Sequence, residues 1–309
     1  MNPALWSAVL VNFLFWSGIA IGAGMFAALL ELTGAAWARP LRPIADRFAA
    51  FLPISLLVYL IAFWNAHTFR WRDAAALAAV YAVAVSFSYA PRIRNAIAFG
   101  LVYAVGFSVI AIDVLMRLEP GWVSTLFPAY AFTANVYGGI AALAVVAAFA
   151  LPVETMKSVA RDLAAILVGF ALIWMYFTWS QFLVIWYGNL PADTSYVIKR
   201  LSGGWRTIAW TVFACRCAVP VVVLLTSFGR RPLLLAITAT VVVIGFWIEC
   251  WLLVVPALPG SFAGIITAAV TAAFAAVFAA SLCWPWQRLL RRAAPLQSAT
   301  AATARPNSL

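Results

Sequence analysis

Long apolar runs recur along the chain, and they limit its fold more than any other feature of the sequence. A helix of about 20 apolar residues spans the hydrocarbon core of a bilayer. Because lipid offers the backbone no hydrogen-bond partners, a spanning chain must form helices or a closed barrel. The runs lack the alternation of barrel strands, and only 9% of the residues are charged. The sequence therefore predicts an all-α, polytopic membrane helix bundle.

Nine membrane spans are predicted from these runs. The third is the weakest, because it is short and Arg70, Arg72, Arg92 and Arg94 crowd its two ends, so a re-entrant or untilted segment is the alternative. The start of the chain, "MNPALW", lacks the basic region and cleavage pattern of a signal peptide, so we expect the first span to be retained. The predicted spans are residues 6–32, 50–67, 74–89, 93–116, 126–151, 163–187, 205–227, 233–255 and 262–283.

A short internal match predicts how the spans are grouped. Asp113 stands seven residues before Pro120, and Glu249 stands seven residues before Pro256, each at the outer end of a span. Four spans separate the two acids, so the two copies share one orientation. The predicted units are a first helix at 1–32, a four-helix bundle at 50–151, a second four-helix bundle at 160–284 and a disordered cytoplasmic tail at 285–309.

The distribution of lysine and arginine predicts the orientation, since positive residues stay cytoplasmic in short loops. With the N-terminus outside, thirteen basic residues fall on the inner side and six on the outer side. This asymmetry predicts an N-out, C-in topology. It also explains most of the net charge of +11, so no nucleic-acid partner is expected and lipid is the expected surrounding.

Cysteine and histidine limit the cofactors. The four cysteines all lie inside predicted spans without metal-ligand spacing, so we expect them to be packing residues. His67 is the only histidine, whereas a membrane haem is commonly held by two. The sequence therefore predicts no metal centre in this chain, and any redox metal would belong to partner subunits.

Polar residues inside the spans are the candidates for function, because they are costly in lipid and usually face the bundle interior or a cavity. Asp113, Gln181 and Glu249 are expected within roughly 5 to 10 Å of the outer helix ends, and Arg216 near the middle of the bilayer, from a rise of 1.5 Å per residue. The four residues could share one outward-facing polar zone. Arg216 can reach Glu249 on the next span, either as a structural tie or to tune a carboxyl that relays protons or faces quinol.

Two segments resemble the F subunit of alternative complex III. The first is "IDVLMRLEPGWVSTLFPAYAF", residues 112–132, with Glu119 where the family has an aspartate. The second is "WSQFLVIWYGNLP", residues 179–191, and a shorter similarity covers "FWIECWLLVVPALP", where Glu249 stands for the family's acid. The matching residues in the two segments are Asp113, Leu115, Met116, Leu118, Pro120, Trp122, Ser124, Thr125, Phe127, Ser180, Gln181, Ile185, Trp186, Tyr187, Asn189 and Pro191.

The resemblance covers about residues 50–258 and implies a fold similar to that of the polysulfide-reductase (NrfD/PsrC-type) membrane subunits. It implies a metal-free subunit of a quinol-oxidising respiratory complex in the bacterial inner membrane, with a second membrane subunit, a periplasmic iron–sulfur subunit and c-type cytochromes as partners. The family's polar interior is suspected of conducting protons. The resulting site candidates are Asp113, Gln181, Arg216, Glu249 and Tyr187, with Glu119, Trp122 and Ser124 as an outer-loop motif.

Two alternatives stay open. The family has a His-Phe-x-x-Pro pattern where this chain reads "CRCAVP", and the chain is shorter than usual members, so its proton path is in question. The runner-up is a subunit that binds quinol itself, with Asp113 or Glu249 accepting the proton and Gln181 or Tyr187 donating to a quinone carbonyl. The third hypothesis is an unrelated transporter or structural membrane protein.

Overall fold

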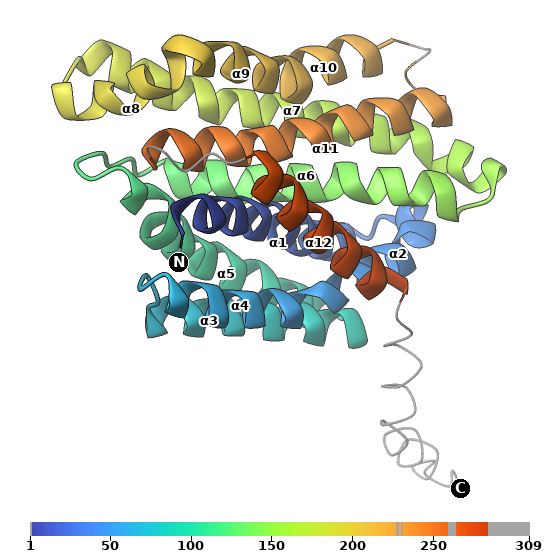
Figure 1. Cartoon of the computed structure of the whole chain (residues 1–309). Helices are drawn as coiled ribbons and strands as arrows, with labels where there is room; N and C mark the ends of the chain where they lie inside the picture. The colour runs from blue at the N-terminus through green and yellow to red at the C-terminus, as the bar shows by residue number, and fades with distance from the viewer. Residues whose placement is uncertain (1, 227–228, 230, 259–263, 284–309) are drawn as a thin grey trace, which may run out of the picture.

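The computed structural model of the chain describes residues 2–226, 229, 231–258 and 264–283. Every regular element in these residues is a helix, and eight of the helical segments are long and apolar enough to cross a membrane. The predicted all-α polytopic fold is therefore confirmed (Figure 1). The predicted tail at 285–309 lies outside the described residues.

The α-helices follow one another with few breaks, and several continue into short 3₁₀ or π turns. Their bounds are α1 (Pro3–Leu32), α2 (Arg42–Phe48), α3 (Leu52–Asn65), α4 (Trp71–Tyr89), α5 (Ile93–Ile110), α6 (Phe127–Ala150), α7 (Val153–Gly188), α8 (Pro191–Leu201), α9 (Gly203–Phe213), α10 (Val219–Leu224), α11 (Pro232–Val254) and α12 (Gly264–Cys283).

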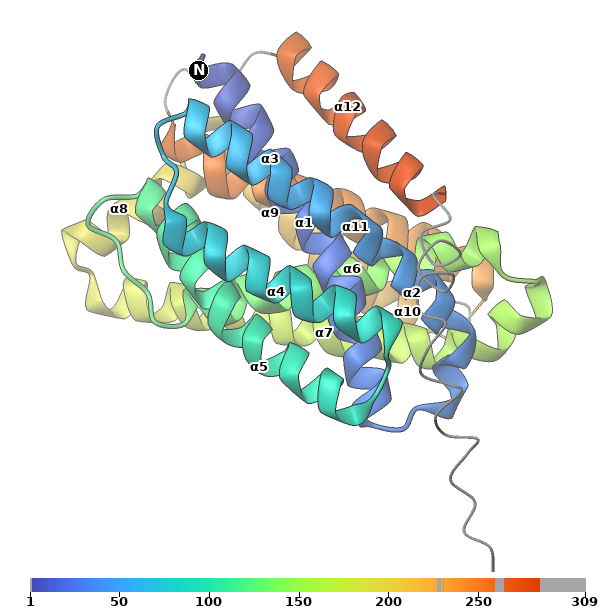
Figure 2. The same ribbon diagram turned by 90° about the horizontal axis from the view of Figure 1, so that it is seen from below.

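Helix α4 is the weakest of the predicted spans in the structure as well. It has 19 residues but is not one of the eight segments apolar enough to cross a membrane, since its first turn carries Arg72 and Asp73 and its last turn is rich in serine and tyrosine. It still packs along α5 and beside α3 (Figure 2). The third predicted span is therefore an ordinary helix of the bundle, less apolar than its neighbours.

Helix α1 lies in the centre of the bundle, in contact with α3, α5, α6, α11 and α12. Its closest partner is α6, where glycines bring the two backbones together. A Cβ on Gly22 would lie 1.9 Å from the Asn135 carbonyl oxygen, and a Cβ on Gly139 would lie 2.2 Å from the Ala23 nitrogen. Membrane helices approach this closely only through small residues. The predicted first helix is thus central to the packing, while the predicted division into two four-helix bundles stays a prediction.

The outer end of the bundle carries one helix that the sequence did not predict. Asn189 ends α7 in the left-handed conformation, with φ of 46°, which asparagine tolerates better than most residues. Pro191 then begins α8, a helix of 11 residues that packs against α7 and α9. Figure 1 shows α8 at the same end of the molecule as the N-terminus and the loop after α5. This end is the predicted outer side.

Candidate functional site

A buried ion pair joins α11 to the helix before it. Arg216 Nε lies 2.9 Å from Glu249 Oε2, and the two side chains are 0% and 1% exposed. The pairing that the sequence allowed is therefore present. A buried pair of this kind must be solvated by the protein itself, because each charge would otherwise be very costly in the membrane interior.

Hydrogen bonds and aromatic rings supply that solvation. The Tyr130 hydroxyl and the Trp174 indole both donate to Glu249 Oε1, the indole at 2.8 Å. Arg216 Nη2 donates to the Ala134 carbonyl oxygen at 3.1 Å, and the guanidinium lies 4.5 Å from the centre of the Tyr137 ring. These contacts come from α6 and α7, so the charge pair ties four helices together.

The local backbone explains how Arg216 reaches this place. Arg216 is the middle residue of a π turn, Ala214–Ala218, that links α9 to α10. Such turns inside helices are rare and occur frequently at functional sites. Gly245 on α11 lets this turn approach, since a Cβ there would lie 2.6 Å from Cys215 Cβ and 3.1 Å from Arg216 Cγ. Glycine at 245 is therefore what allows α11 to pack against the turn.

A cavity of about 410 Å³ lies among α7, α8, α9 and α11, with Glu249 in its wall. The rest of the lining is mostly apolar and aromatic, and includes Trp174, Trp179 and Phe213. Gln181, one of the sequence candidates, also lines it. Apolar walls with a few polar groups are typical of sites for small amphiphilic molecules.

Helix α8 covers this cavity, and the predicted outer-loop motif holds α8 in place. Glu119 binds Lys199 at 2.7 Å and Arg200 at 3.0 Å, while Trp122 stacks on Tyr196 with ring centres 3.7 Å apart. Tyr196 and Arg200 both line the cavity. Burial raises the pKa of the Tyr196 hydroxyl, which therefore stays neutral. Glu119 and Trp122 therefore attach α8 to the loop after α5 through two ion pairs and a stacked ring pair.

Ser124, the third residue of the motif, lies next to the wall of the cavity. Its hydroxyl donates to Gln181 Oε1 at 3.4 Å, and Gln181 Nε2 donates to the Phe177 carbonyl oxygen at 3.2 Å within its own helix. Gln181 therefore lines the cavity and also connects α7 to the loop after α5.

Two of the predicted site residues lie elsewhere. Asp113 does not join the zone of Glu249; it binds Arg70 and Arg72 at the outer ends of α4 and α5. The expected single polar zone is therefore two clusters, because Asp113 pairs with Arg70 and Arg72 whereas Glu249 pairs with Arg216. Tyr187 is 87% exposed near the end of α7, so it fits a membrane-interface position and not the cavity.

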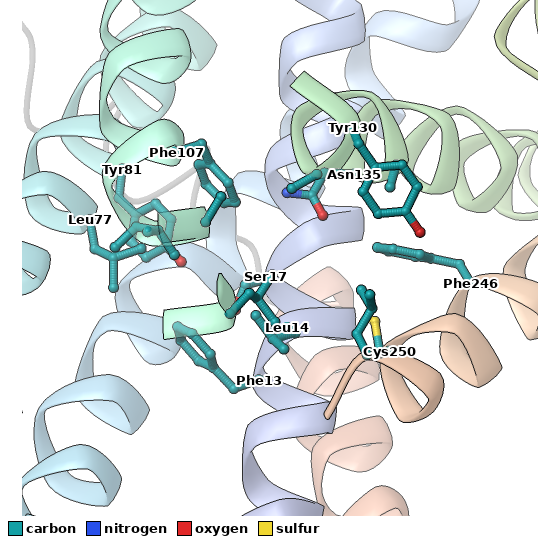
Figure 3. A pocket seen from close by; sticks show the side chains of 16 residues that line it. Phe13, Leu14, Ser17, Leu77, Tyr81, Phe107, Tyr130, Asn135, Phe246 and Cys250 are labelled. Carbon is teal, nitrogen blue, oxygen red and sulfur yellow. The ribbon is translucent and has the colours of Figure 1, made fainter. Parts of the chain in front are cut away.

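A second, closed cavity lies between α1, α4, α5, α6 and α11 (Figure 3). Its volume is about 40 Å³, which holds about two or three waters at most. Tyr130 borders it on one side, while Tyr81 and Ser17, which share hydrogen bonds with Ser55, border the other. Most of its wall is apolar, as Figure 3 shows with Phe107 and neighbouring side chains. The cavity is too small for an organic ligand. Its apolar wall lies between Tyr130 and the hydrogen-bonded group of Ser17, Ser55 and Tyr81.

The sequence missed several residues of the site. Tyr130, Trp174 and Arg200 were not candidates, because aromatic residues in apolar runs and an arginine in a loop carry no signal of their own. The amphipathic pattern of the segment that begins at Pro191 was the sequence signal available for α8. Within the described residues, no group of three or more His, Cys, Asp and Glu side chains gathers closely enough to hold a metal ion.

The fold and the buried charge pair define an integral, multi-pass helical membrane protein. No protein-family model matches the chain, and a search of curated proteins finds no match either.

Proposed function

We propose that the chain is a metal-free membrane subunit of a quinol oxidoreductase of the alternative complex III type, and that Glu249 is its proton-exchanging group. The proposed complex lies in the bacterial inner membrane and contains a second membrane subunit, an iron–sulfur subunit and c-type cytochromes. The buried pair of Glu249 and Arg216 beside the cavity carries the role of Glu249, and the resemblance of residues 112–132 and 179–191 supports the type of complex. A carboxyl that is desolvated yet paired with a cation and open to a cavity can change its protonation state when its surroundings change.

The contacts of Glu249 support a role beyond a structural tie. Its Oε1 accepts hydrogen bonds from Tyr130 and Trp174, so this oxygen keeps its partners when the carboxyl gains a proton on Oε2. The ion pair to Arg216 through Oε2 would weaken at that moment. Protonation therefore changes one defined contact, which is what a relay group requires.

Replacing Glu249 with Gln in the purified complex tests this role. We expect proton release to the outer side to fall at least tenfold. The unpaired guanidinium of Arg216 also lowers the stability of this variant, so its rate is compared with the wild type per assembled complex, as judged by subunit composition. Quinol oxidation and proton release are measured separately. Unchanged values for both would reduce the pair to a tie between helices.

The cavity favours a second candidate, in which this chain binds quinol itself. A quinol head would fit among Trp174, Trp179 and Phe213, with Glu249 as the proton acceptor and Gln181 as a donor to a quinone carbonyl. Photo-crosslinking with an azido-quinone would label α7 or α9 in this case. Labelling of the sister subunit alone would leave only the first proposal.

A further inference from the structure

Helix α12 lies at the edge of the bundle, and a groove of about 600 Å³ separates it from α9 and α11 (Figure 2). Its main contacts are with α1, with α2 and with the turn that follows α2. Ala268 and Ala272 of α12 are exposed and belong to the wall, so the groove opens toward the membrane. The facing wall is aromatic and aliphatic, with Trp205, Ile208, Trp247 and Ile248. The groove therefore offers an apolar surface that these helices do not fill.

The depth of the groove matches one leaflet of the bilayer. Along α12 it runs from Gly264, the first residue of the helix, to Ala275. At 1.5 Å per residue this length is roughly 16 Å, and half of a hydrocarbon core of about 30 Å is about 15 Å. The small residues of α12 would also let a partner helix approach, but such a helix crosses both leaflets. A groove of this depth instead fits an acyl chain of one lipid in the outer leaflet.

The outer rim of the groove carries positive charge. Trp205 lines the groove from the first turn of α9, and Arg206 follows it. Arg206 is exposed and makes no ion pair within the part of the chain that the structure describes. No side chain caps the start of α9, so its first N–H groups are available to an acceptor. Arginine and the N-terminus of a helix both attract phosphate, which a phospholipid carries at this level.

Two polar groups in the wall have no hydrogen-bond partner among the described atoms. They are the Thr267 hydroxyl and the Trp247 indole nitrogen. Thr267 is only 7% exposed, and such a group is costly to leave unpaired in lipid. It lies three residues below Gly264, which is roughly 5 Å along the helix axis and close to the level of the glycerol esters of a lipid. An ester carbonyl oxygen in the groove can accept from it after a small rotation of the side chain.

We propose that the groove binds one phospholipid of the outer leaflet. An acyl chain lies between α12 and the pair of α9 and α11, and the phosphate lies at the rim, near Arg206 and the start of α9. Thr267 and Trp247 donate to the ester carbonyl oxygens. None of the residues that line this groove lines the cavity beside Glu249, so the proposal does not depend on a role in quinol oxidation.

Native mass spectrometry of the purified full chain tests the proposal. The chain is stripped of lipid in detergent and then offered phosphatidylglycerol, or a diacylglycerol with the same acyl chains. We expect the wild-type chain to keep one phosphatidylglycerol under collisional activation that removes the diacylglycerol. Ala268→Leu, which fills the groove, should keep at least threefold less. Ala269→Leu is the matched control, since Ala269 is exposed at the same depth but does not line the groove, and it should keep as much as the wild type.

Arg206→Gln tests the place of the phosphate. We expect this variant to keep at least threefold less phosphatidylglycerol and to bind the diacylglycerol as the wild type does, because only the charge at the rim is lost. Equal retention in Ala268→Leu and Ala269→Leu, equal retention of the two lipids by the wild-type chain, or no effect of Arg206→Gln would overturn the proposal. A co-purified quinone or polypeptide that Ala268→Leu alone releases would overturn it as well.

Discussion

The buried pair of Arg216 and Glu249 gives an asymmetric prediction for the stability of single variants. At a separation of 2.9 Å, the attraction of two unit charges is about 6 kcal/mol for an effective dielectric constant of about 20. The desolvation of both groups offsets much of this attraction, so the pair as a whole contributes little. Breaking the pair is different, because it leaves one buried charge unpaired, at a cost of about 3–5 kcal/mol.

Removing Arg216 and removing Glu249 should lower the free energy of unfolding by different amounts. In Arg216→Met, Glu249 can take up a proton and become neutral, and Tyr130 and Trp174 still donate to it. In Glu249→Gln, the guanidinium cannot lose its proton and keeps its buried charge. We therefore expect Glu249→Gln to lower the free energy of unfolding by about 3–5 kcal/mol, and Arg216→Met to lower it by less. The double variant should be about as stable as Arg216→Met alone.

Equilibrium unfolding in mixed detergent micelles measures these three variants against the wild-type chain. Losses that simply add in the double variant, or a larger loss for Arg216→Met than for Glu249→Gln, would refute the reasoning.

Three further predictions concern the packing around the site. Gly139→Ala should lower the free energy of unfolding by more than about 2 kcal/mol, because its Cβ would meet the backbone of α1 at 2.2 Å, while Gly169→Ala, with nothing within 4 Å, should not lower it, as thermal unfolding would show. Glu119→Gln should speed hydrogen exchange in α8, whereas Glu154→Gln, in an exposed pair, should leave α8 unchanged. Trp174→Phe should cost about 1.5–3 kcal/mol in the same unfolding assay, since it removes a hydrogen bond to a charged carboxylate.

The sequence was a good guide to the helices because apolar length is a direct requirement of the bilayer. The run at 126–151 became α6 at Phe127–Ala150, and the run at 233–255 became α11 at Pro232–Val254. Helix α8 was missed because an amphipathic helix at the surface contains no long apolar run, and its charges read as a loop. Local composition thus predicts what crosses the membrane better than what lies on it.

The site was predicted in part, for reasons that depend on each residue. Glu249 and Arg216 were found together because a charge inside a span is costly and few partners exist. Asp113 lies near the outer end of its span as expected, but its grouping with Glu249 was wrong, because its partners Arg70 and Arg72 lie beyond the apolar run of their helix and were counted as loop charges. Partners across helices depend on packing, which a single sequence does not contain.

The composition of the complex that co-purifies with the tagged chain at its natural level, from membranes solubilised in a mild detergent, tests the proposed function most directly. We predict a second multi-pass subunit, an iron–sulfur protein and c-type cytochromes, with quinol oxidation that responds to Glu249→Gln. A chain that purifies without redox subunits, and whose fraction oxidises no quinol, would contradict the proposal.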